Sequence, residues 1–371
     1  MTTRTLDHDG FSSLAAEFIE LFDAWNSPAD QWTDSRFDEL SRRAFEVQYA
    51  GNVSYRKYCD ARGVTTADVS CWRDPPCVPT AAFRVVDLVV GRTTDARLEF
   101  RTSGTTGGSA GRGRHLVRDP ALYRASLRSA FRTLVLPENT TRNIITLLPS
   151  FTYSPDSSLG WMLKDIREAM GGPRSESVAT SGGIDWARLE AVLLAAAAEA
   201  PVLIMGTTLA FAEWWSRLES GASAAPALPV GSMLMDTGGT KGRAGVDRPL
   251  MMRRLRTRLN VPEDGVVSEF GMTELLSQRY SRGDHPGPFA GPPWLRTRVL
   301  DPVTLDEVPA GKAGILCHFD LANLGSVCSV LTEDLGRVSE EGIELLGRSA
   351  GAPPRGCSLS TAEILEAQRN A

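Results

Sequence analysis

Apolar residues near the start of the chain recur every three or four positions, which is the spacing of one face of an α-helix. The pattern runs from Phe11 to about Ala61 and ends at the Pro-rich segment 74–79. Its apolar positions are Phe11, Leu14, Phe18, Leu21, Phe22 and Trp25, followed by Phe37, Leu40, Phe45 and Val47. The pattern therefore predicts a helical N-terminal segment over residues 1–80.

Beyond residue 80, short apolar runs rich in β-branched residues alternate with helical patterns. Such alternation favours an α/β architecture, so we expect an α/β core over residues 81–345 and a short C-terminal tail over 346–371. The predicted strands cover 83–90, 97–100, 143–149, 202–205, 230–235, 266–269 and 313–319. The predicted helices cover 157–170, 184–200 and 248–259.

The composition agrees with a folded globular chain and excludes some classes of partner. Of the 371 residues, 42% are apolar and 23% are charged, and the net charge of -5 provides no basic surface for nucleic acid. Residues 1–18 lack the basic flank and apolar core of a secretory signal. The most apolar stretch, 189–205, is interrupted by two glutamates and a proline. We therefore expect a cytoplasmic protein that binds neither nucleic acid nor a membrane.

The six cysteines are scattered, without CxxC pairs or histidines at the spacing of zinc ligands. A structural metal is therefore not expected. Five of them stand in no local context that indicates chemistry and are predicted to be core or surface thiols: Cys59, Cys71, Cys77, Cys317 and Cys328. The sixth, Cys357, follows a segment rich in glycine and proline near the C-terminus.

The segment from Thr102 to Gly107 combines hydroxyl side chains with glycines directly after the predicted strand 97–100. Glycine lets backbone N–H groups approach an anion closely, and serine and threonine hydroxyls add hydrogen-bond donors. The loop is therefore a candidate phosphate site, although such a composition is also typical of a flexible turn. The Walker pattern GxxxxGK[ST] is absent, because no lysine lies between Lys57 and Lys164.

Together with Phe270-Gly-Met-Thr-Glu274, this loop resembles the adenylate-forming superfamily of acyl-CoA synthetases and luciferases. The closer resemblance is to the acyl-protein synthetase component of bacterial luminescence fatty-acid reductases and to phenylacetate-CoA-ligase-like enzymes. It spans roughly residue 75 to the C-terminus. It rests on the segments Leu148-Pro-Ser-Phe, Ser157-Ser-Leu-Gly, Thr237-Gly-Gly-Thr-Lys-Gly242, Ser268 to Gln278 and Arg355-Gly-Cys-Ser-Leu359. The resemblance implies the large N-terminal domain of an adenylate-forming enzyme, with the small mobile C-terminal domain largely absent.

The resemblance also implies roles for individual residues. The loop Thr102, Ser103, Gly104, Thr105, Thr106 and Gly107 would wrap the β- and γ-phosphates of ATP. In the second motif, Phe270 would lie near the adenine, Gly271 and Met272 would belong to the nucleotide-binding turn, Thr273 would contact the α-phosphate and Glu274 would hold Mg²⁺. A carboxylate beside phosphates is tolerable mainly when a hard cation bridges them. The alternative for Glu274 is a surface residue at a helix start.

Further positions follow from the same resemblance. Gly238 and Gly239 would form the turn beside the adenine, and Lys241 would neutralise phosphate or carboxylate. Asp334 would accept hydrogen bonds from the ribose hydroxyls, and Arg348 would be the hinge arginine near the ribose and phosphates. Each has a structural alternative: a plain turn for the glycines, an exposed solubilising side chain for Lys241 and a turn aspartate for Asp334.

Two departures from the superfamily pattern are visible. The lysine that usually ends the phosphate loop is missing, and Arg112, Arg114 and His115 follow the loop instead. The chain also ends 23 residues after Arg348, as in the acyl-protein synthetases. There the resemblance makes Cys357 a carrier thiol for the acyl group, while the alternative is a half-buried cysteine before a helix over 361–368.

These features predict an AMP-forming ligase that uses ATP and Mg²⁺ to activate a small carboxylic acid in a biosynthetic pathway. The acyl group would pass to Cys357, to another thiol or to an amine, with an acyl-accepting or reductase protein as partner. One alternative is an ATP-independent acyltransferase that takes acyl groups from a carrier thioester. The other is a non-catalytic subunit of a reductase or biosynthetic complex.

Overall fold

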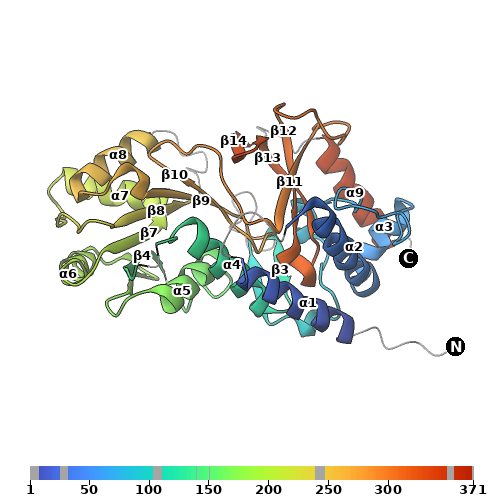
Figure 1. Cartoon of the computed structure of the whole chain (residues 1–371), viewed down its shortest axis with the longest axis horizontal. Coiled ribbons are helices and arrows are strands. Elements are labelled where there is room, and N and C mark those ends of the chain that lie inside the picture. Colours follow the sequence, from blue (N-terminus) through green and yellow to red (C-terminus); the bar gives the residue numbers. More distant parts are fainter. Residues whose placement is uncertain are drawn as a thin grey trace. The chain divides into compact units, whose positions relative to one another are not determined.

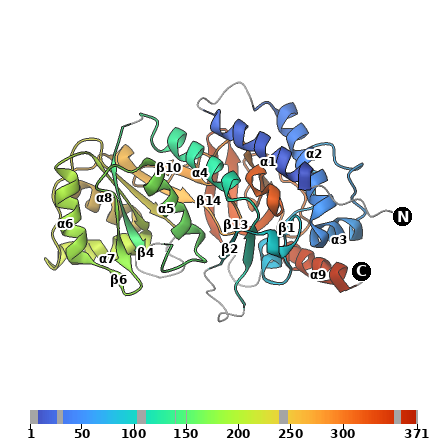
Figure 2. The ribbon, with the colours of Figure 1, turned by 90° about the horizontal axis from the view of Figure 1, so that it is seen from below.

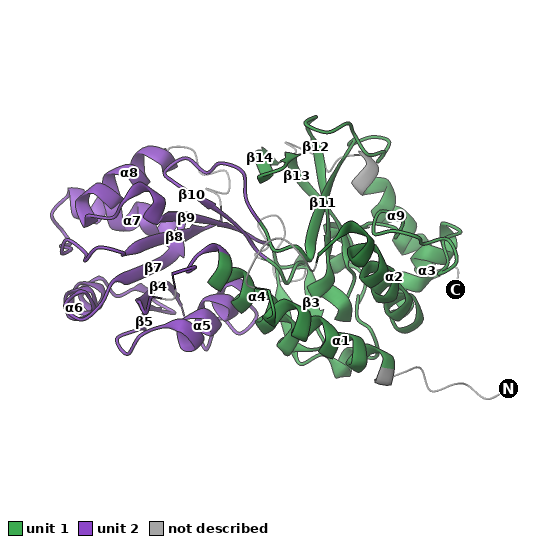
Figure 3. Ribbon diagram, in the orientation of Figure 1, with its two compact units in different colours: residues 1–133, 272–277, 291–371 green, residues 134–271, 278–290 purple. Residues whose placement is uncertain are grey.

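The computed structural model describes residues 8–25, 32–102, 111–138, 140–149, 151–238, 247–348 and 355–369 (Figure 1). These residues form two compact units (Figure 3). Unit 1 comprises residues 1–133, 272–277 and 291–371, and unit 2 comprises residues 134–271 and 278–290. The predicted division into an N-terminal segment, an adenylation core and a tail follows other boundaries and stays a prediction.

The helical N-terminal segment contains α1 (His8–Asp23), α2 (Asp34–Gly51) and α3 (Val53–Ala61). Thr33 caps α2 by accepting from the amide of Arg36, and Asn52 caps α3 by accepting from the amide of Tyr55. Such caps satisfy amides that have no partner inside a helix. All three helices belong to unit 1 (Figure 2). Their apolar faces are buried, as the spacing predicted.

The main sheet of unit 1 has the strand order β1-β13-β12-β11, with β14 paired to β13. Its strands are β1 (Val78–Pro79), β11 (Leu295–Leu300), β12 (Gly314–Asp320), β13 (Ser329–Ser339) and β14 (Gly342–Arg348). Unit 1 also contains the hairpin of β2 (Leu98–Arg101) and β3 (Arg114–Val117) and most of α4 (Pro120–Leu134). Its described residues include the 3-10 turns η1 (Thr80–Arg84), η2 (Thr93–Asp95) and η5 (Leu321–Gly325). The final helix, α9 (Arg355–Arg369), packs against α3 and β1.

The predicted strand over 83–90 is wrong. Residues 80–84 form η1, and the residues up to 90 lie in an irregular segment. Leu88, Val89 and Val90 are buried because this segment crosses the core. The amide of Val90 donates to the carbonyl of Gly325, and the next amide donates to Gly51, so neither enters a strand ladder. An apolar run with β-branched residues therefore marked a buried loop here.

Unit 2 is built on a sheet with the order β10-β9-β8-β7-β4-β5-β6. Five neighbouring strands are parallel: β4 (Asn143–Pro149), β5 (Glu176–Thr180), β7 (Val202–Thr207), β8 (Met233–Thr237) and β9 (Val266–Phe270). The antiparallel edge strands are β6 (Gly183–Ile184) and β10 (Arg279–Arg282). The helices are α5 (Ser158–Met170), α6 (Trp186–Ala197), α7 (Thr208–Glu219) and α8 (Arg248–Leu259), with the 3-10 turn η4 (Glu263–Gly265) before β9.

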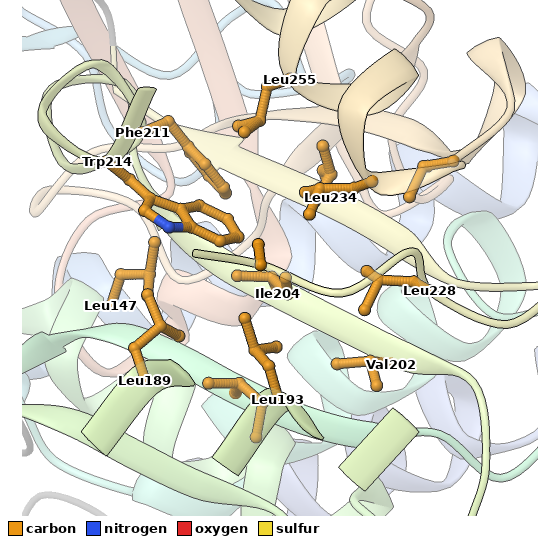
Figure 4. Packing of buried hydrophobic residues seen from close by; sticks show 14 of the residues in the cluster. Leu147, Leu189, Leu193, Val202, Ile204, Phe211, Trp214, Leu228, Leu234 and Leu255 are labelled. Carbon is orange, nitrogen blue, oxygen red and sulfur yellow. The ribbon is translucent and has the colours of Figure 1, made fainter. Parts of the chain in front are cut away.

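A dense apolar core joins this sheet to α6, α7 and α8 (Figure 4). Leu193 from α6, Trp214 from α7 and Leu255 from α8 are fully buried against Ile204 and Leu234 of the sheet. Burying one such side chain contributes about 1.5–3 kcal/mol. Parallel strands require crossover connections, and these helices supply them while burying the strands.

Most predicted elements of unit 2 are confirmed, with shifted ends. The strand predicted over 230–235 begins at Met233, and the helix predicted over 184–200 spans only Trp186–Ala197. Ile184 instead pairs with Ala179 in β6, and Asp185 caps α6 by accepting from the amide of Arg188. The carboxyl ends of the parallel strands share one edge, which is where ligands bind in open α/β sheets.

The C-terminal helix is longer than predicted. It begins at Arg355 rather than Thr361, so the backbone of Cys357 lies inside α9 and not before it. No helix in the described part of the chain has the length and apolar character needed to cross a membrane.

Candidate functional site

The candidate phosphate loop connects the two strands of the β2–β3 hairpin in unit 1. Arg101 and Arg114 are the last paired residues of the ladder. Beyond them, the Thr102 amide donates to the Gly113 carbonyl over 3.0 Å, and the Gly113 amide donates to Thr102 Oγ1 over 2.9 Å. Thr102 thus closes the base of the loop. Ser103, Gly104, Thr105, Thr106 and Gly107 lie outside the described residues.

The two arginines that follow the loop are engaged within unit 1. The guanidinium of Arg112 donates to the carbonyls of Thr102 and Arg101, over 2.5 Å from Nε and 3.2 Å from Nη2. Arg114 forms ion pairs of 3.0 Å with both Glu99 and Asp87. These contacts stabilise the base of the hairpin, so the two arginines are not simple replacements for the missing lysine.

His115, on β3, joins the hairpin to the second motif. Its Nδ1 lies 2.7 Å from the carbonyl oxygen of Thr273, and because a carbonyl can only accept, Nδ1 carries the proton. The ring is buried, and burial lowers the pKa of His115 to about 4 despite this hydrogen bond. Its Nε2 has no hydrogen-bond partner among the described residues. His115 is therefore a neutral side chain that positions Thr273.

The backbone around Glu274 is fixed by side chains from the end of β12 and from η5. Asn323 Nδ2 donates to the Glu274 carbonyl over 2.8 Å. The carboxylate of Asp320 accepts from the amides of Leu276 and Ser277, each over 2.9 Å, and from the Ser277 hydroxyl over 2.6 Å. Burial raises the pKa of Asp320 to about 6 against the effect of these donors. Residues 273–277 are therefore held in one conformation before any ligand binds.

The Glu274 side chain is 8% exposed, so it is not a surface residue at a helix start. Burial raises the pKa of Glu274 to about 7, while its own backbone amide, Arg348 and Arg84 lower it and Asp334 raises it. Arg348 Nε donates to Asp334 Oδ1 over 2.8 Å. Glu274, Asp334 and Arg348, which the sequence singled out separately, thus belong to one charged cluster in unit 1. Arg84 was missed, because nothing in its local sequence marks it.

The donor set fits a magnesium ion bound together with a nucleotide. No group of three or more His, Cys, Asp or Glu side chains in the described ranges could hold a metal ion alone. Mg²⁺ in nucleotide sites takes one or two carboxylates, with phosphate oxygens and water completing its shell. Glu274 supplies one buried carboxyl group whose ionised form a dication would stabilise. Mg²⁺ itself remains a proposal.

At the carboxyl edge of the unit 2 sheet, a buried polar network ties β8 and β9 to the starts of α7 and α8. Arg248 contacts the Asp236 carboxylate twice, with Nε over 2.9 Å and Nη2 over 2.5 Å, and it also donates to Ser268 Oγ. Thr208 Oγ1 lies 2.8 Å from Asp236 Oδ2 and 2.5 Å from the Gly238 carbonyl oxygen. The start of the predicted adenine turn is therefore anchored.

Glu269 is a buried carboxyl group that the sequence did not reveal. It pairs in register with Thr237, whose hydroxyl donates to Glu269 Oε2 over 2.5 Å. Burial raises the pKa of Glu269 to about 7 against this hydrogen bond, and Asp236 adds to the rise. A Cβ at Gly271 would lie 2.5 Å from Glu269 Oε1, so a larger residue there would force this carboxyl group to shift. The sequence feature that could have indicated this buried carboxyl group is a glutamate near the end of an apolar strand.

The structure describes some of the remaining predicted site residues and not others. Gly238 has a φ of 75°, a conformation that favours glycine. Phe270 packs against Phe289 with ring centroids 6.0 Å apart, and Met272 packs against an apolar cluster of unit 1. Gly239 and Lys241 lie outside the described residues, and only the backbone of Cys357 is described. Their proposed roles stay predictions.

The comparison with protein families decides what kind of chain this is. The model of the family "Acyl-protein synthetase, LuxE" matches residues 30–366. The chain belongs to this family. The predicted resemblance is therefore confirmed over most of the chain.

Two curated relatives carry the name long-chain-fatty-acid–luciferin-component ligase. The protein from Vibrio harveyi is 29% identical over 119 residues, which cover 30% of this chain and 31% of the relative. The protein from Aliivibrio fischeri is 31% identical over 84 residues, which cover 20% of this chain and 22% of the relative. The aligned segments thus span less than a third of either relative.

Solved structures show the fold. A 2-hydroxyisobutyryl-CoA ligase in its postadenylation state matches with a TM-score of 0.62 at 16% identity, covering 88% of this chain and 72% of the ligase. An open conformation of the same ligase matches with a TM-score of 0.59, covering 75% of the ligase. The predicted fold class, the α/β fold of adenylate-forming enzymes, is confirmed by these matches.

Proposed function

We propose that this member of the acyl-protein synthetase family uses ATP to activate a carboxylic acid. The substrate carboxylate would attack the α-phosphorus, and pyrophosphate would leave, so that an acyl-adenylate is formed. The acyl group would then pass to a thiol. The observation that carries this proposal is the buried Glu274 carboxyl group, which lies on a fixed backbone and shares a charged cluster with Asp334 and Arg348.

The residues of the chain would act mainly by positioning and by electrostatics. Thr102 to Gly107 would bind the β- and γ-phosphates, Thr273 the α-phosphate and Asp334 the ribose hydroxyls. Phe270, Gly238 and Gly239 would bind the adenine, and Arg348 and Lys241 would balance negative charge. Glu274 would hold Mg²⁺, which neutralises phosphate charge when bound.

Carboxylate-dependent exchange of radiolabelled pyrophosphate into ATP tests the activation step. The names of the Vibrio and Aliivibrio relatives specify a long-chain fatty acid, so a panel of fatty acids of graded length is the first choice. We expect Glu274→Gln to reduce exchange at least about 100-fold, because it removes the carboxylate proposed for Mg²⁺. The matched control is Glu344→Gln, whose side chain is 52% exposed on β14, and it should keep wild-type exchange.

The same experiment can reject the proposal. A folded protein that shows no exchange with the whole panel, and no binding of ATP with Mg²⁺ by calorimetry, would be an ATP-independent acyltransferase or a non-catalytic subunit. The acyltransferase has one observation in its favour. Arg112 and Arg114 are engaged within unit 1 and His115 is neutral, so none of them is a plain substitute for the missing lysine.

We further propose Cys357 as the acyl acceptor. Its backbone lies in the first turn of α9, and amides at a helix start generally stabilise an anion such as a thiolate. Intact-mass analysis after incubation with ATP, Mg²⁺ and the acid should show one acyl adduct, removed by neutral hydroxylamine and absent in Cys357→Ser. An adduct that persists in Cys357→Ser would assign the acceptor to another residue.

A further inference from the structure

Two cysteines far apart in the sequence meet in unit 1. Cys77 directly precedes β1, and Cys317 lies in the middle of β12. Their sulfur atoms are 2.9 Å apart, with the thiol of Cys317 donating to Cys77 Sγ. Arg298 Nη2 donates to the same Cys77 sulfur over 2.8 Å. The sulfur of Cys77 therefore has two donors, one of them positively charged.

The sheet brings these groups to one face. Arg298 on β11 and Cys317 on β12 are register partners, so their side chains point to the same side. Cys77 lies outside the strand ladder, and the chain around it is held by two tyrosine hydroxyls. Tyr55 donates to the Pro76 carbonyl over 2.9 Å, and Tyr58 donates to the Cys77 carbonyl over 3.2 Å.

This environment shifts the pKa values of the two thiols in opposite directions. The Cys317 thiol and Arg298 lower the pKa of Cys77 to about 5, against the opposing effect of burial. Burial raises the pKa of Cys317 well above its usual value, and its side chain is 1% exposed. Cys77 is a half-buried residue, whereas Cys317 is buried. The two donors to Cys77 thus favour its thiolate form, and burial favours the protonated form of the neighbouring Cys317 thiol.

Two other thiols described in unit 1, Cys59 and Cys328, lack this arrangement. Cys59 and Cys328 are buried, and burial raises the pKa of Cys59 to about 12 and the pKa of Cys328 well above its usual value. Both are therefore protonated near pH 7 and poorly reactive. The pairing of Cys77 with Cys317 needs a specific explanation, since free thiols are usually inert fillers of a core.

We propose that Cys77 and Cys317 are a redox pair that forms a reversible disulfide on exposure to a hydroperoxide. The Cys77 thiolate attacks the terminal peroxide oxygen, which breaks the O–O bond and leaves a sulfenic acid on Cys77. The leaving group is hydroxide from hydrogen peroxide, or an alkoxide from an organic hydroperoxide. The Cys317 sulfur then attacks the Cys77 sulfur, and the departing hydroxyl group leaves as water with the Cys317 proton. The pair loses two electrons and the peroxide gains them.

The geometry accommodates the bond. A disulfide has a sulfur separation of about 2.05 Å, so the two sulfurs, now 2.9 Å apart, need to approach by roughly 0.9 Å. Cys77 is not part of the β1 ladder, which starts at Val78, so this approach does not require strand pairing to break. Neither ATP nor an acid takes part, and the proposal stands or falls independently of the ligase activity.

The first test is thiol labelling of the reduced full-length protein. Iodoacetamide should label Cys77 about tenfold faster than Cys71 at pH 7, because Arg298 and the Cys317 thiol stabilise the thiolate form of Cys77. Cys71 is the matched control, since it is also half-buried. The labelling rate of Cys77 should fall only near pH 5. Equal rates for the two cysteines would contradict the proposal.

The second test follows the product. After treatment with hydrogen peroxide, peptide mapping without reductant should show one Cys77–Cys317 cross-linked peptide, and dithiothreitol should restore both thiols. In Cys317→Ser, the cross-link should disappear and Cys77 should be trapped as a sulfenic acid by dimedone. Arg298→Gln should slow both labelling and oxidation of Cys77. A disulfide between Cys77 and another cysteine, or oxidation of Cys71 ahead of Cys77, would overturn the assignment.

Discussion

At the scale of single residues, His115 shows how burial changes what a side chain can contribute. The sequence suggested it as one of the basic groups near the phosphate loop. In the structure it is buried and neutral, because burial lowers the pKa of His115 to about 4, and it donates to the Thr273 carbonyl. Its contribution is therefore the position of the Thr273–Glu274 backbone rather than positive charge.

This role predicts the effect of replacing His115. We expect His115→Leu to reduce pyrophosphate exchange about tenfold, because a buried carbonyl without a donor costs about 1–3 kcal/mol. His115→Asn should recover most of the rate, since the asparagine amide can place a donor near the position of Nδ1. Exposed His285→Leu serves as the control. Wild-type exchange in His115→Leu, or no recovery in His115→Asn, would rule out the positioning role.

At the scale of elements, the start of α8 is joined to the carboxyl edge of the unit 2 sheet by an ion pair, and the start of α7 is joined to it by a hydrogen bond from Thr208. Asp236 is 3% exposed, and the Arg248 guanidinium contacts both of its carboxylate oxygens. Removing one partner of a buried pair leaves an uncompensated charge, which is costly. The network also fixes the entrance to the turn at Gly238 through Thr208.

Arg248→Ala should therefore lower the free energy of unfolding by about 3–5 kcal/mol. Arg254→Ala, in the same helix, removes an ion pair to Glu219 whose side chains are 52% and 50% exposed, and should cost about 1 kcal/mol or less. Urea denaturation followed by tryptophan fluorescence measures both. An equal decrease in the free energy of unfolding for the two variants would show that the Asp236–Arg248 pair stabilises the fold no more than an exposed ion pair does.

At the scale of the whole molecule, the dependence of the unfolding free energy on pH is the sum of contributions from several buried groups, and these contributions have opposite signs. Burial raises the pKa values of Glu269 and Glu274 to about 7 and of Asp320 to about 6, so the folded chain binds more protons there than the unfolded chain. Stability contributed by these groups falls as pH rises from about 4.5 to 7. The lowered pKa values of His115 and Cys77 act in the opposite direction.

The contribution of one group can be isolated with a variant. Glu269→Gln should gain stability relative to wild type as pH rises from 5 to 8, by up to about 3 kcal/mol, because it removes a carboxyl group that ionises at a cost. The control Glu168→Gln changes a side chain that is 56% exposed and should differ from wild type by a constant amount. Urea midpoints at several pH values test this, and a pH-independent difference for Glu269→Gln would contradict the raised pKa.

Local sequence patterns were sufficient to predict many of the helices and strands. The helical spacing of apolar residues located α1 and α2, and the buried runs at 143–149 and 202–205 located β4 and β7, because one face or both faces of these elements are buried. The strand prediction for residues 83–90 was wrong because a buried loop and a buried strand have the same apolar residue pattern. The motif Phe270-Gly-Met-Thr-Glu274 predicted a role for Glu274 without any structure.

The sequence by itself determined the family and the α/β class, since both depend on residue types at short spacing, and it predicted the nucleotide-motif residues. Only the tertiary structure decided that Glu274, Asp334, Arg348 and Arg84 share one electrostatic cluster and that His115 is neutral. It alone brought Cys77 to Cys317, which are 240 residues apart along the chain. Electrostatic coupling and burial depend on distances in space, and the chain acquires those distances only when its strands pair and its core closes.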